Sequence, residues 1–193
     1  ASGAVHAAAA NSAVSDGGTL VYLRLGGFGL GGLAPRTVVW VDRQGREEAL
    51  NAPLRPYVYP RLSPDGTRVA LDIRDQGQDI WIWDVGRKTM TPLTFDPAFD
   101  TLPVWSPDGR RLVWGSERAG PALNLYWQAA DGTGKVERLT ESRTAHRPSA
   151  FTPDGTRLLM TEVLSPDDLA GADIAMLSLD GTPHLGRLGA NAI

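Results

Sequence analysis

Apolar side chains in this chain gather in short runs of five to seven residues, separated by polar turns rich in glycine, proline and aspartate. Runs rich in β-branched and aromatic residues are typical of strands that are buried on both faces. No segment shows helical periodicity. The pattern therefore predicts an all-β fold. Its two main sets of strands are expected at 20–25, 68–73, 111–116 and 157–163, and at 37–42, 79–84, 124–128 and 173–178.

A six-residue motif repeats along the chain. Ser-Pro-Asp-Gly-Thr-Arg at 63–68 recurs as Ser-Pro-Asp-Gly-Arg-Arg at 106–111 and as Thr-Pro-Asp-Gly-Thr-Arg at 152–157, and a weaker copy stands at 15–19. Proline presets φ, and glycine takes the left-handed conformation that closes a hairpin. We therefore interpret the three aspartates of the motif as turn residues. The four motif glycines, at 17, 66, 109 and 155, are 49, 43 and 46 residues apart.

Two shorter strands complete each repeat. One is expected just before the turn, at 59–62, 102–105 and 149–151, and another ends near Leu50, Leu93, Leu139 and Leu188. A four-stranded antiparallel unit that repeats every 40 to 50 residues or so is a β-propeller blade. The sequence therefore predicts a single propeller domain over 1–193, with blades at about 12–52, 57–95, 100–141 and 146–190. We expect these four blades to form half of an eight-bladed ring, and a closed four-bladed ring is the alternative.

The motifs resemble a known repeat. Ser-Pro-Asp-Gly-x-Arg, the strand Asp-Ile-Trp-Ile-Trp-Asp at 79–84 and Pro-Leu-Thr at 92–94 are similar to the TolB-type WD-like repeat, and Arg-Leu-Thr at 138–140 repeats the last element. More narrowly, the chain resembles the propeller segment of bacterial serine/threonine protein kinases, without any kinase motif. The resemblance implies a binding or sensing scaffold. It transfers no catalytic residue, because the shared positions are turn and core positions.

Composition excludes several classes of function. The chain has no cysteine, so disulfides and thiolate chemistry are absent. A net charge of −3 without a basic block argues against nucleic acid, and no apolar run is long enough to insert into a membrane. The opening ten residues are small and apolar but lack the charged start of a signal peptide. The compartment, cytoplasmic or extracytoplasmic, is left open.

One glycine-rich segment matches a nucleotide-binding pattern. Gly-Phe-Gly-Leu-Gly-Gly at 27–32 fits G-x-G-x-x-G, but a strand is expected after it, whereas a dinucleotide site needs a helix there. We interpret the segment as a loop within the first blade. The tryptophans all fall in expected strands and are interpreted as core residues.

Equivalent positions in three successive blades suggest a candidate site. Tyr57, Asp100 and His146 each lie five residues before the apolar residue that precedes the turn. We expect this position at the mouth of a central channel. Asp100 and His146 would then stand side by side, with Tyr57 and Tyr59 next to them as further ligand-binding residues.

The chemistry of this pair leaves two interpretations open. Asp100 and His146 are candidate catalytic residues, one as a general base and the other as the residue that orients it. They are also candidate ligands of a divalent metal such as zinc or calcium. The simpler interpretation is a solvated loop histidine paired with an aspartate. His6 joins the same rim if the N-terminal segment folds across it, and His184 is expected to be structural.

The leading functional hypothesis is a non-catalytic module that binds a ligand or a protein at the channel mouth, related to a kinase-attached propeller. The alternative is a hydrolase of activated esters or phosphoesters with a metal or His/Asp site there. A third possibility is a pure scaffold for protein partners.

A homodimer is expected in each case, because the outer blades of an open arc would leave apolar faces bare. The residues expected on those faces are Leu20, Tyr22, Val39, Leu158, Met160 and Ile174.

Overall fold

The computed structural model describes residues 12–14, 20–25, 34–75, 77–163, 172–179 and 185–188. The weak motif copy at 15–19, the glycine-rich loop at 27–32, His6 and His184 lie outside these residues. Contacts between residues divide the chain into two compact units, 1–97 and 98–193. In the part of the chain that the structure describes, no helix is long and apolar enough to cross a membrane.

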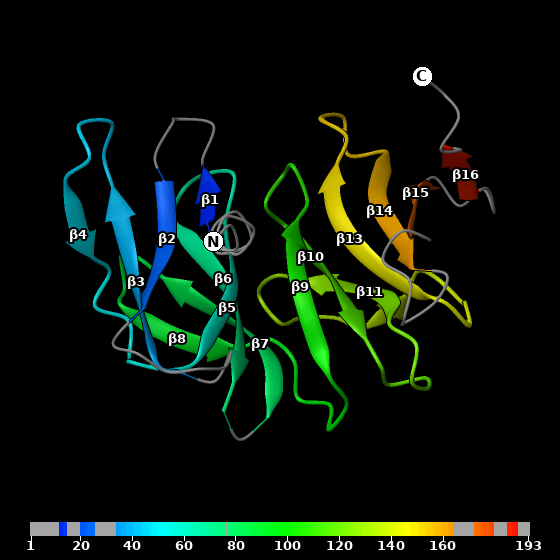
Figure 1. The fold of residues 1–193 in the computed structure, drawn as a ribbon, viewed down its shortest axis with the longest axis horizontal. Helices are drawn as coiled ribbons and strands as arrows, with labels where there is room; N and C mark the ends of the chain where they lie inside the picture. Colours follow the sequence, from blue (N-terminus) through cyan, green and yellow to red (C-terminus); the bar gives the residue numbers. More distant parts are fainter. Residues whose placement is uncertain are drawn as a thin grey trace, which may run out of the picture. The chain divides into compact units, whose positions relative to one another are not determined.

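The first unit contains two four-stranded antiparallel sheets, each with its strands in chain order (Figure 1). Strands β1 and β2 of one sheet pack against β5 of the other. The strands are β1 (Ser12–Val14), β2 (Leu20–Leu25), β3 (Arg36–Val41), β4 (Glu47–Ala49), β5 (Tyr57–Leu62), β6 (Arg68–Arg74), β7 (Gln78–Asp84) and β8 (Thr89–Pro92).

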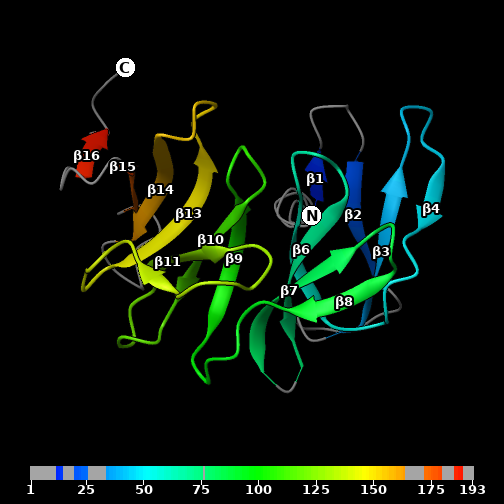
Figure 2. The same cartoon turned by 180° about the vertical axis from the view of Figure 1, so that it is seen from behind.

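The second unit repeats this arrangement with two more sheets (Figure 2). Here β9, β10 and β11 pack against β13. The strands are β9 (Asp100–Trp105), β10 (Arg111–Ser116), β11 (Asn124–Ala129), β12 (Glu137–Arg138), β13 (Ala145–Phe151), β14 (Arg157–Val163), β15 (Ala172–Ser178) and β16 (Leu185–Leu188). The predicted all-β fold of four-stranded antiparallel blades is confirmed, and the size of the ring stays a prediction.

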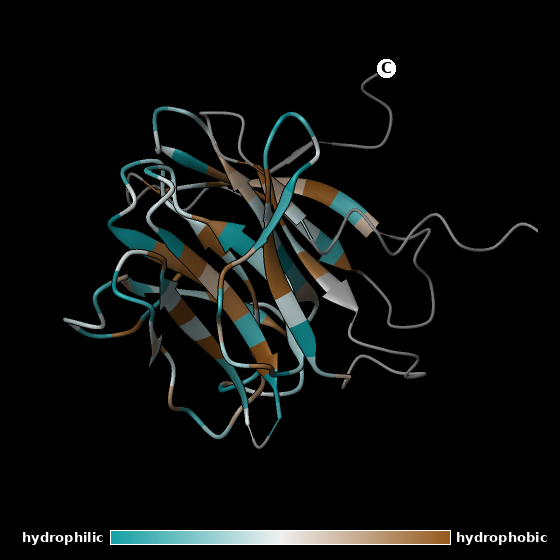
Figure 3. Cartoon of the chain, turned by 90° about the vertical axis from the view of Figure 1, so that its left-hand side faces the viewer, coloured by the Kyte–Doolittle hydropathy of each residue, from teal (hydrophilic) through white to brown (hydrophobic). Residues whose placement is uncertain are grey.

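In the second and third blades, the second strand is buried almost throughout. The five central residues of β6 are all buried, and so are the last five of β10. This near-continuous burial matches strands covered on both faces, whereas β4, β8 and β12 carry exposed residues. Brown and teal bands alternate along many of the strands in Figure 3, as expected where side chains point to opposite faces. In the first unit the buried apolar cluster includes Val21, Val38, Tyr57, Val69, Leu71, Ile73 and Trp83.

The repeated Leu-Thr dipeptide has a structural explanation. The hydroxyl of Thr94 accepts a hydrogen bond from the backbone N–H of Ile80 at 3.0 Å, and that of Thr140 accepts one from Leu125 at 2.9 Å. Both hydroxyls are buried. Each threonine therefore satisfies a backbone donor at the end of its blade, where the fourth strand stops.

The first strands of the second, third and fourth blades are longer than predicted. β5, β9 and β13 begin at Tyr57, Asp100 and Ala145, and each has a register shift in its pairing with the next strand. At this shift Tyr59 and Leu102 take positive φ values of 46° and 58°. The bulge lets each strand extend past its proline to an earlier start. The predicted strands at 59–62 and 102–105 already crossed Pro60 and Pro103, whereas the one at 149–151 began after Pro148.

The expected bare faces are only partly bare. Val39, Leu158 and Met160 are fully buried, so the expectation is wrong for these three residues. Leu158 and Met160 face the neighbouring blade of their own unit, where they belong to one cluster with Val113, Leu125, Ala175 and Leu177. Ile174 is 52% exposed, as expected.

Candidate functional site

The repeated aspartates stabilise hairpin turns. The Ser63 hydroxyl donates to Asp65 Oδ1 at 2.5 Å and accepts from the backbone N–H of Arg68 at 2.9 Å. The hydrogen bond from this hydroxyl lowers the pKa of Asp65. Gly66 closes the turn with φ of 72°. Asp108 and Asp154 make the same contacts, with Ser106 and Thr152, and have lowered pKa values for the same first reason.

The predicted site residues occupy equivalent positions on the backbone. In the first strand of each blade, Tyr57 pairs with Ile73, Asp100 with Ser116 and His146 with Glu162. All three predicted residues are almost fully buried and belong to a strand. The interpretation of His146 as a solvated loop residue is therefore wrong, because the longer strand takes its backbone into the sheet.

Asp100 is held by an arginine that the sequence did not single out. Arg118 Nη2 donates to both carboxylate oxygens of Asp100, at 2.9 and 3.2 Å, and Arg118 Nε donates to the Ser116 hydroxyl at 2.9 Å. The guanidinium carbon lies 4.9 Å from the ring centroid of Tyr126 and 5.7 Å from that of Trp114. Asp100 is fully buried, whereas the Arg118 side chain is 16% exposed. The result is a preorganised ion pair packed on aromatic rings.

His146 has different surroundings, although its position is equivalent. Its Nε2 lies 3.7 Å from Glu162 Oε1, and that oxygen accepts a hydrogen bond of 2.7 Å from the Thr144 hydroxyl. Ser142 in turn contacts Thr144, with 2.7 Å between the two hydroxyl oxygens. The backbone N–H of His146 donates to the Leu123 carbonyl at 2.8 Å. This cluster joins the start of the fourth blade to the segment that connects it to the third.

Tyr57 belongs to the first unit. Its hydroxyl donates to the Pro53 carbonyl, and burial, opposed by the Arg55 charge and reinforced by the Asp75 charge, raises its pKa to about 12. Arg55 Nη2 lies 2.6 Å from Asp75 Oδ2, and its guanidinium lies 4.4 Å from the ring centroid of Trp81. The phenol is therefore uncharged and bound to the backbone.

Tyr59 takes part in a second arginine contact of the same unit. The Arg74 guanidinium lies 5.7 Å from the Tyr59 ring centroid and donates to both carboxylate oxygens of buried Asp72, at 3.2 Å each. The expected proximity of the two tyrosines to Asp100 and His146 stays a prediction, because these pairs lie in different units.

The metal-binding role of Asp100 and His146 also stays a prediction. Zinc takes three or four protein ligands and calcium six or more oxygens. Within the described residues, no group of three or more His, Cys, Asp or Glu side chains is arranged to hold a metal ion. Both oxygens of Asp100 already bind Arg118, and Glu162, the acid next to His146, accepts from Thr144.

Sequence reasoning missed Arg118, Glu162 and Thr144. Each lies outside the repeated motif, 16 to 18 residues from its partner. The register offered one usable signal: the residue opposite His146 in the predicted hairpin is Glu162. Arg118 follows the end of β10 in a loop, and no spacing rule connects it to Asp100.

A comparison with protein families identifies the repeat. The model of the TolB beta propeller domain matches residues 39–181. The chain belongs to this family. The narrower resemblance to kinase-attached propellers stays a prediction.

Individual relatives agree with this assignment. The uncharacterized peptidase YuxL of Bacillus subtilis is 34% identical over 109 residues, which cover 53% of this chain and 16% of that protein. The Tol-Pal system protein TolB of Helicobacter pylori is 28% identical over 83 residues, or 42% of this chain and 20% of that protein. The crystal structure of TolB from Acinetobacter baumannii matches with a TM-score of 0.73 at 19% identity, over 92% of this chain and 42% of that one.

This TolB propeller chain is therefore similar to a part of longer proteins. It covers less than a third of the length of these curated relatives. The structural similarity shows the fold alone, because at this low sequence identity a shared fold does not imply a shared function.

Proposed function

We propose that this TolB propeller chain is a non-catalytic binding module. The observation that carries the proposal is the state of Asp100: its carboxylate is fully buried and accepts two hydrogen bonds from Arg118. A general base or a metal ligand needs a lone pair that can reach its proton or metal. The ion pair engages both oxygens of this buried carboxylate, and it gives the arginine a fixed orientation suited to recognition.

The name of one relative favours binding to another protein. TolB of Helicobacter pylori is named as a component of the Tol-Pal system, and it shares the repeat of this chain. Among the described residues, the hydrogen bonds of Arg118 to Asp100 and Ser116 use Nη2 and Nε, which leaves Nη1 for an incoming acceptor. An arginine held in this way can donate to a peptide carbonyl or a carboxylate of a partner.

The similarity to a peptidase favours hydrolysis as the second candidate. YuxL is 34% identical in the matched region, but that region is only 16% of YuxL. In this alternative the His146–Glu162 pair and Asp100 would supply the acid–base or metal chemistry on an activated ester or phosphoester.

Turnover and binding assays on the purified chain separate the two candidates. We expect no hydrolysis of p-nitrophenyl acetate or bis(p-nitrophenyl) phosphate beyond the buffer rate, with or without EDTA. Peptides selected from a phage-displayed library should bind with saturation in calorimetry, and they should bind Arg118→Lys more weakly. Turnover that is lost with EDTA or in His146→Ala would instead establish the hydrolase.

The proposal includes a second copy of the chain as a partner. In the fourth blade, Leu158 and Met160 are buried on the face toward its neighbour, whereas Ile174 on β15 is 52% exposed. Within each unit, an apolar blade face is covered by the neighbouring blade, so we expect a blade of a second copy to cover the face that carries Ile174. Light scattering at micromolar concentration should give twice the chain mass of 20.7 kDa. A mass of 20.7 kDa contradicts the homodimer, and with it the half of an eight-bladed ring.

A further inference from the structure

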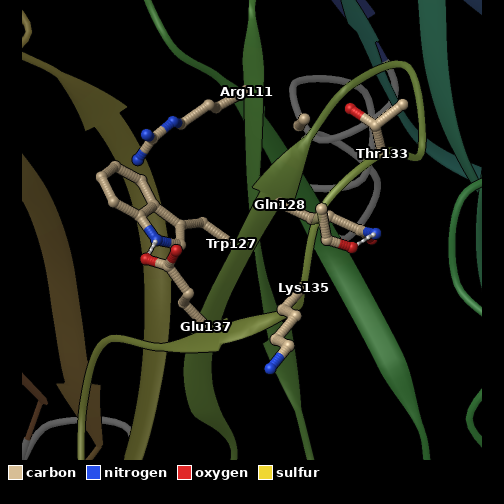
Figure 4. Close-up of a pocket in the computed structure, with 8 residues that line it drawn as sticks. Arg111, Trp127, Gln128, Thr133, Lys135 and Glu137 are labelled. Atoms are coloured by element: carbon tan, nitrogen blue, oxygen red, sulfur yellow. Dashed lines mark hydrogen bonds between the residues drawn. The ribbon is translucent and has the colours of Figure 1, made fainter.

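A small hollow lies at the outer edge of the third blade, in the second unit (Figure 4). Its volume is about 160 Å³. The hollow exists because β12 has only two residues, Glu137 and Arg138, which pair with Trp127 and Tyr126. At the start of β11, the edge is covered by Leu139, whose backbone N–H donates to the Leu125 carbonyl at 2.8 Å, and at its other end the loop that follows β11 borders the hollow.

One wall of the hollow is a stack of an arginine on a tryptophan. The Arg111 guanidinium lies 4.0 Å from the ring centroid of Trp127, and the indole N–H donates to Glu137 Oε2 at 2.7 Å. Figure 4 shows the guanidinium on one side of the indole and the Glu137 carboxylate at its nitrogen. A stacked guanidinium keeps its in-plane N–H donors available. Among the described residues, that of Arg111 makes no hydrogen bond or ion pair.

The opposite wall is a loop held in one conformation. Gln128 Nε2 donates to the carbonyls of Gly132 and Gly134, at 3.2 and 3.3 Å, and Asp131 accepts from the backbone and hydroxyl of Thr133 at 2.9 and 2.6 Å. The two glycines have φ values of 78° and 76°. This loop places Lys135 in the lining of the hollow, and in Figure 4 its side chain extends away from Arg111. Its ammonium group has no hydrogen bond or ion pair to a described residue.

We infer that this hollow binds a small monocarboxylate. The planar donors of Arg111 match the two oxygens of a carboxylate, and Lys135 adds a second positive charge. Glu137 contributes one negative charge that is fixed by the indole, so a group with two negative charges, such as phosphate, is disfavoured. A volume of about 160 Å³ is the space of about five water molecules, and it accommodates an acid of a few non-hydrogen atoms.

The fourth blade provides a matched control. Arg157 occupies the same place in its repeat as Arg111, but its guanidinium lies 3.8 Å from the sulfur of Met176, where the third blade has Trp127. The arginine of the turn motif alone therefore does not make the site. The first blade pairs a tryptophan with an acid at the equivalent register, Trp40 with Glu48, so the third blade differs by combining this pair with Arg111 and Lys135.

Titration with sodium propanoate tests the inference, with the indole N–H resonance of Trp127 as readout. We expect a saturable shift at millimolar concentration. It should be at least about tenfold weaker in Arg111→Gln and clearly weaker in Lys135→Met, but unchanged in Arg157→Gln. Propylammonium chloride and inorganic phosphate, at equal ionic strength, are the charge controls.

Each outcome decides for or against the site. A shift that does not saturate, that persists in both Arg111→Gln and Lys135→Met, or that propylammonium reproduces, overturns the inference. Phosphate binding tighter than propanoate overturns the assignment to a monocarboxylate. If Arg111→Gln does not fold, Lys135→Met alone decides, because Lys135 makes no contact that the fold requires.

Discussion

The two ends of the first strand in each blade differ in what holds them. At the turn end, the same serine or threonine, aspartate and glycine make the same hydrogen bonds three times, between residues two to five positions apart. At the starting end, the three equivalent residues have three different environments. Asp100 binds Arg118, and His146 faces Glu162, 16 to 18 residues away.

This contrast teaches where the repeat ends and where individual chemistry begins. Local hydrogen bonds need only a short motif, so they recur wherever the motif recurs. Partners that come from another strand or loop are not part of the motif, so each blade can change them independently. The starting ends are therefore where we expect recognition, and the turns are where we expect stability.

Removing Arg118 should have the largest effect on stability. In Arg118→Met the fully buried Asp100 loses its cation, and we expect a loss of about 3 kcal/mol in the free energy of unfolding. The double variant Asp100→Leu/Arg118→Met should recover much of this loss, because no buried charge remains. Urea denaturation of the single and double variants measures the coupling. Additive losses would mean that the ion pair does not hold this end of the strand.

A turn glycine should have the next largest effect. Gly66 has φ of 72°, and a Cβ added there would meet no atom within 4 Å, so Gly66→Val is unfavourable through the backbone alone. We expect a loss of more than ~1 kcal/mol. Gly86→Val is the control, since Gly86 does not have a positive φ. Equal thermal melts for the two variants would contradict the turn assignment.

The bulge in β9 should reverse the usual order of two substitutions. Leu102 has φ of 58°, which glycine adopts readily and alanine does not. Leu102→Gly should therefore be as stable as Leu102→Ala, or more stable by a few tenths of a kcal/mol. In an ordinary strand the alanine variant is the more stable one. Chemical denaturation that gives this ordinary order would show that the positive φ carries no strain.

Acid should weaken the turns by the smallest amount, because their aspartates are exposed. The pKa of Asp108 is lowered in the folded chain, first by the Ser106 hydroxyl, so its contribution is complete above the unfolded pKa of about 3.9. That contribution is lost as the pH falls through the lower, folded pKa. The stability difference between the parent and Asp108→Asn, measured by denaturation from pH 7 to pH 2, should shrink below about pH 4. A constant difference would contradict the contribution of the charge.

The repeat and its strands could be predicted from the sequence because their signals are local. Ser-Pro-Asp-Gly places a turn within four residues, and the apolar runs place the strands on either side of it. The starts of β5, β9 and β13 were predicted two to four residues too late, because the bulge through which they extend has no local signal in the sequence. A bulge lets these strands continue, with a left-handed residue in β5 and β9, and this conformation depends on pairing with the neighbouring strand.

The candidate site could be predicted only as a set of positions. The spacing from the turn places Tyr57, Asp100 and His146 at equivalent points, and the strand register agrees. Their partners and their burial were decided by the tertiary structure, because contacts such as Arg118–Asp100 depend on how a loop folds back over the sheet. A short motif contains enough information for a turn, whereas a buried charge is stable only where the whole chain brings its counter-charge.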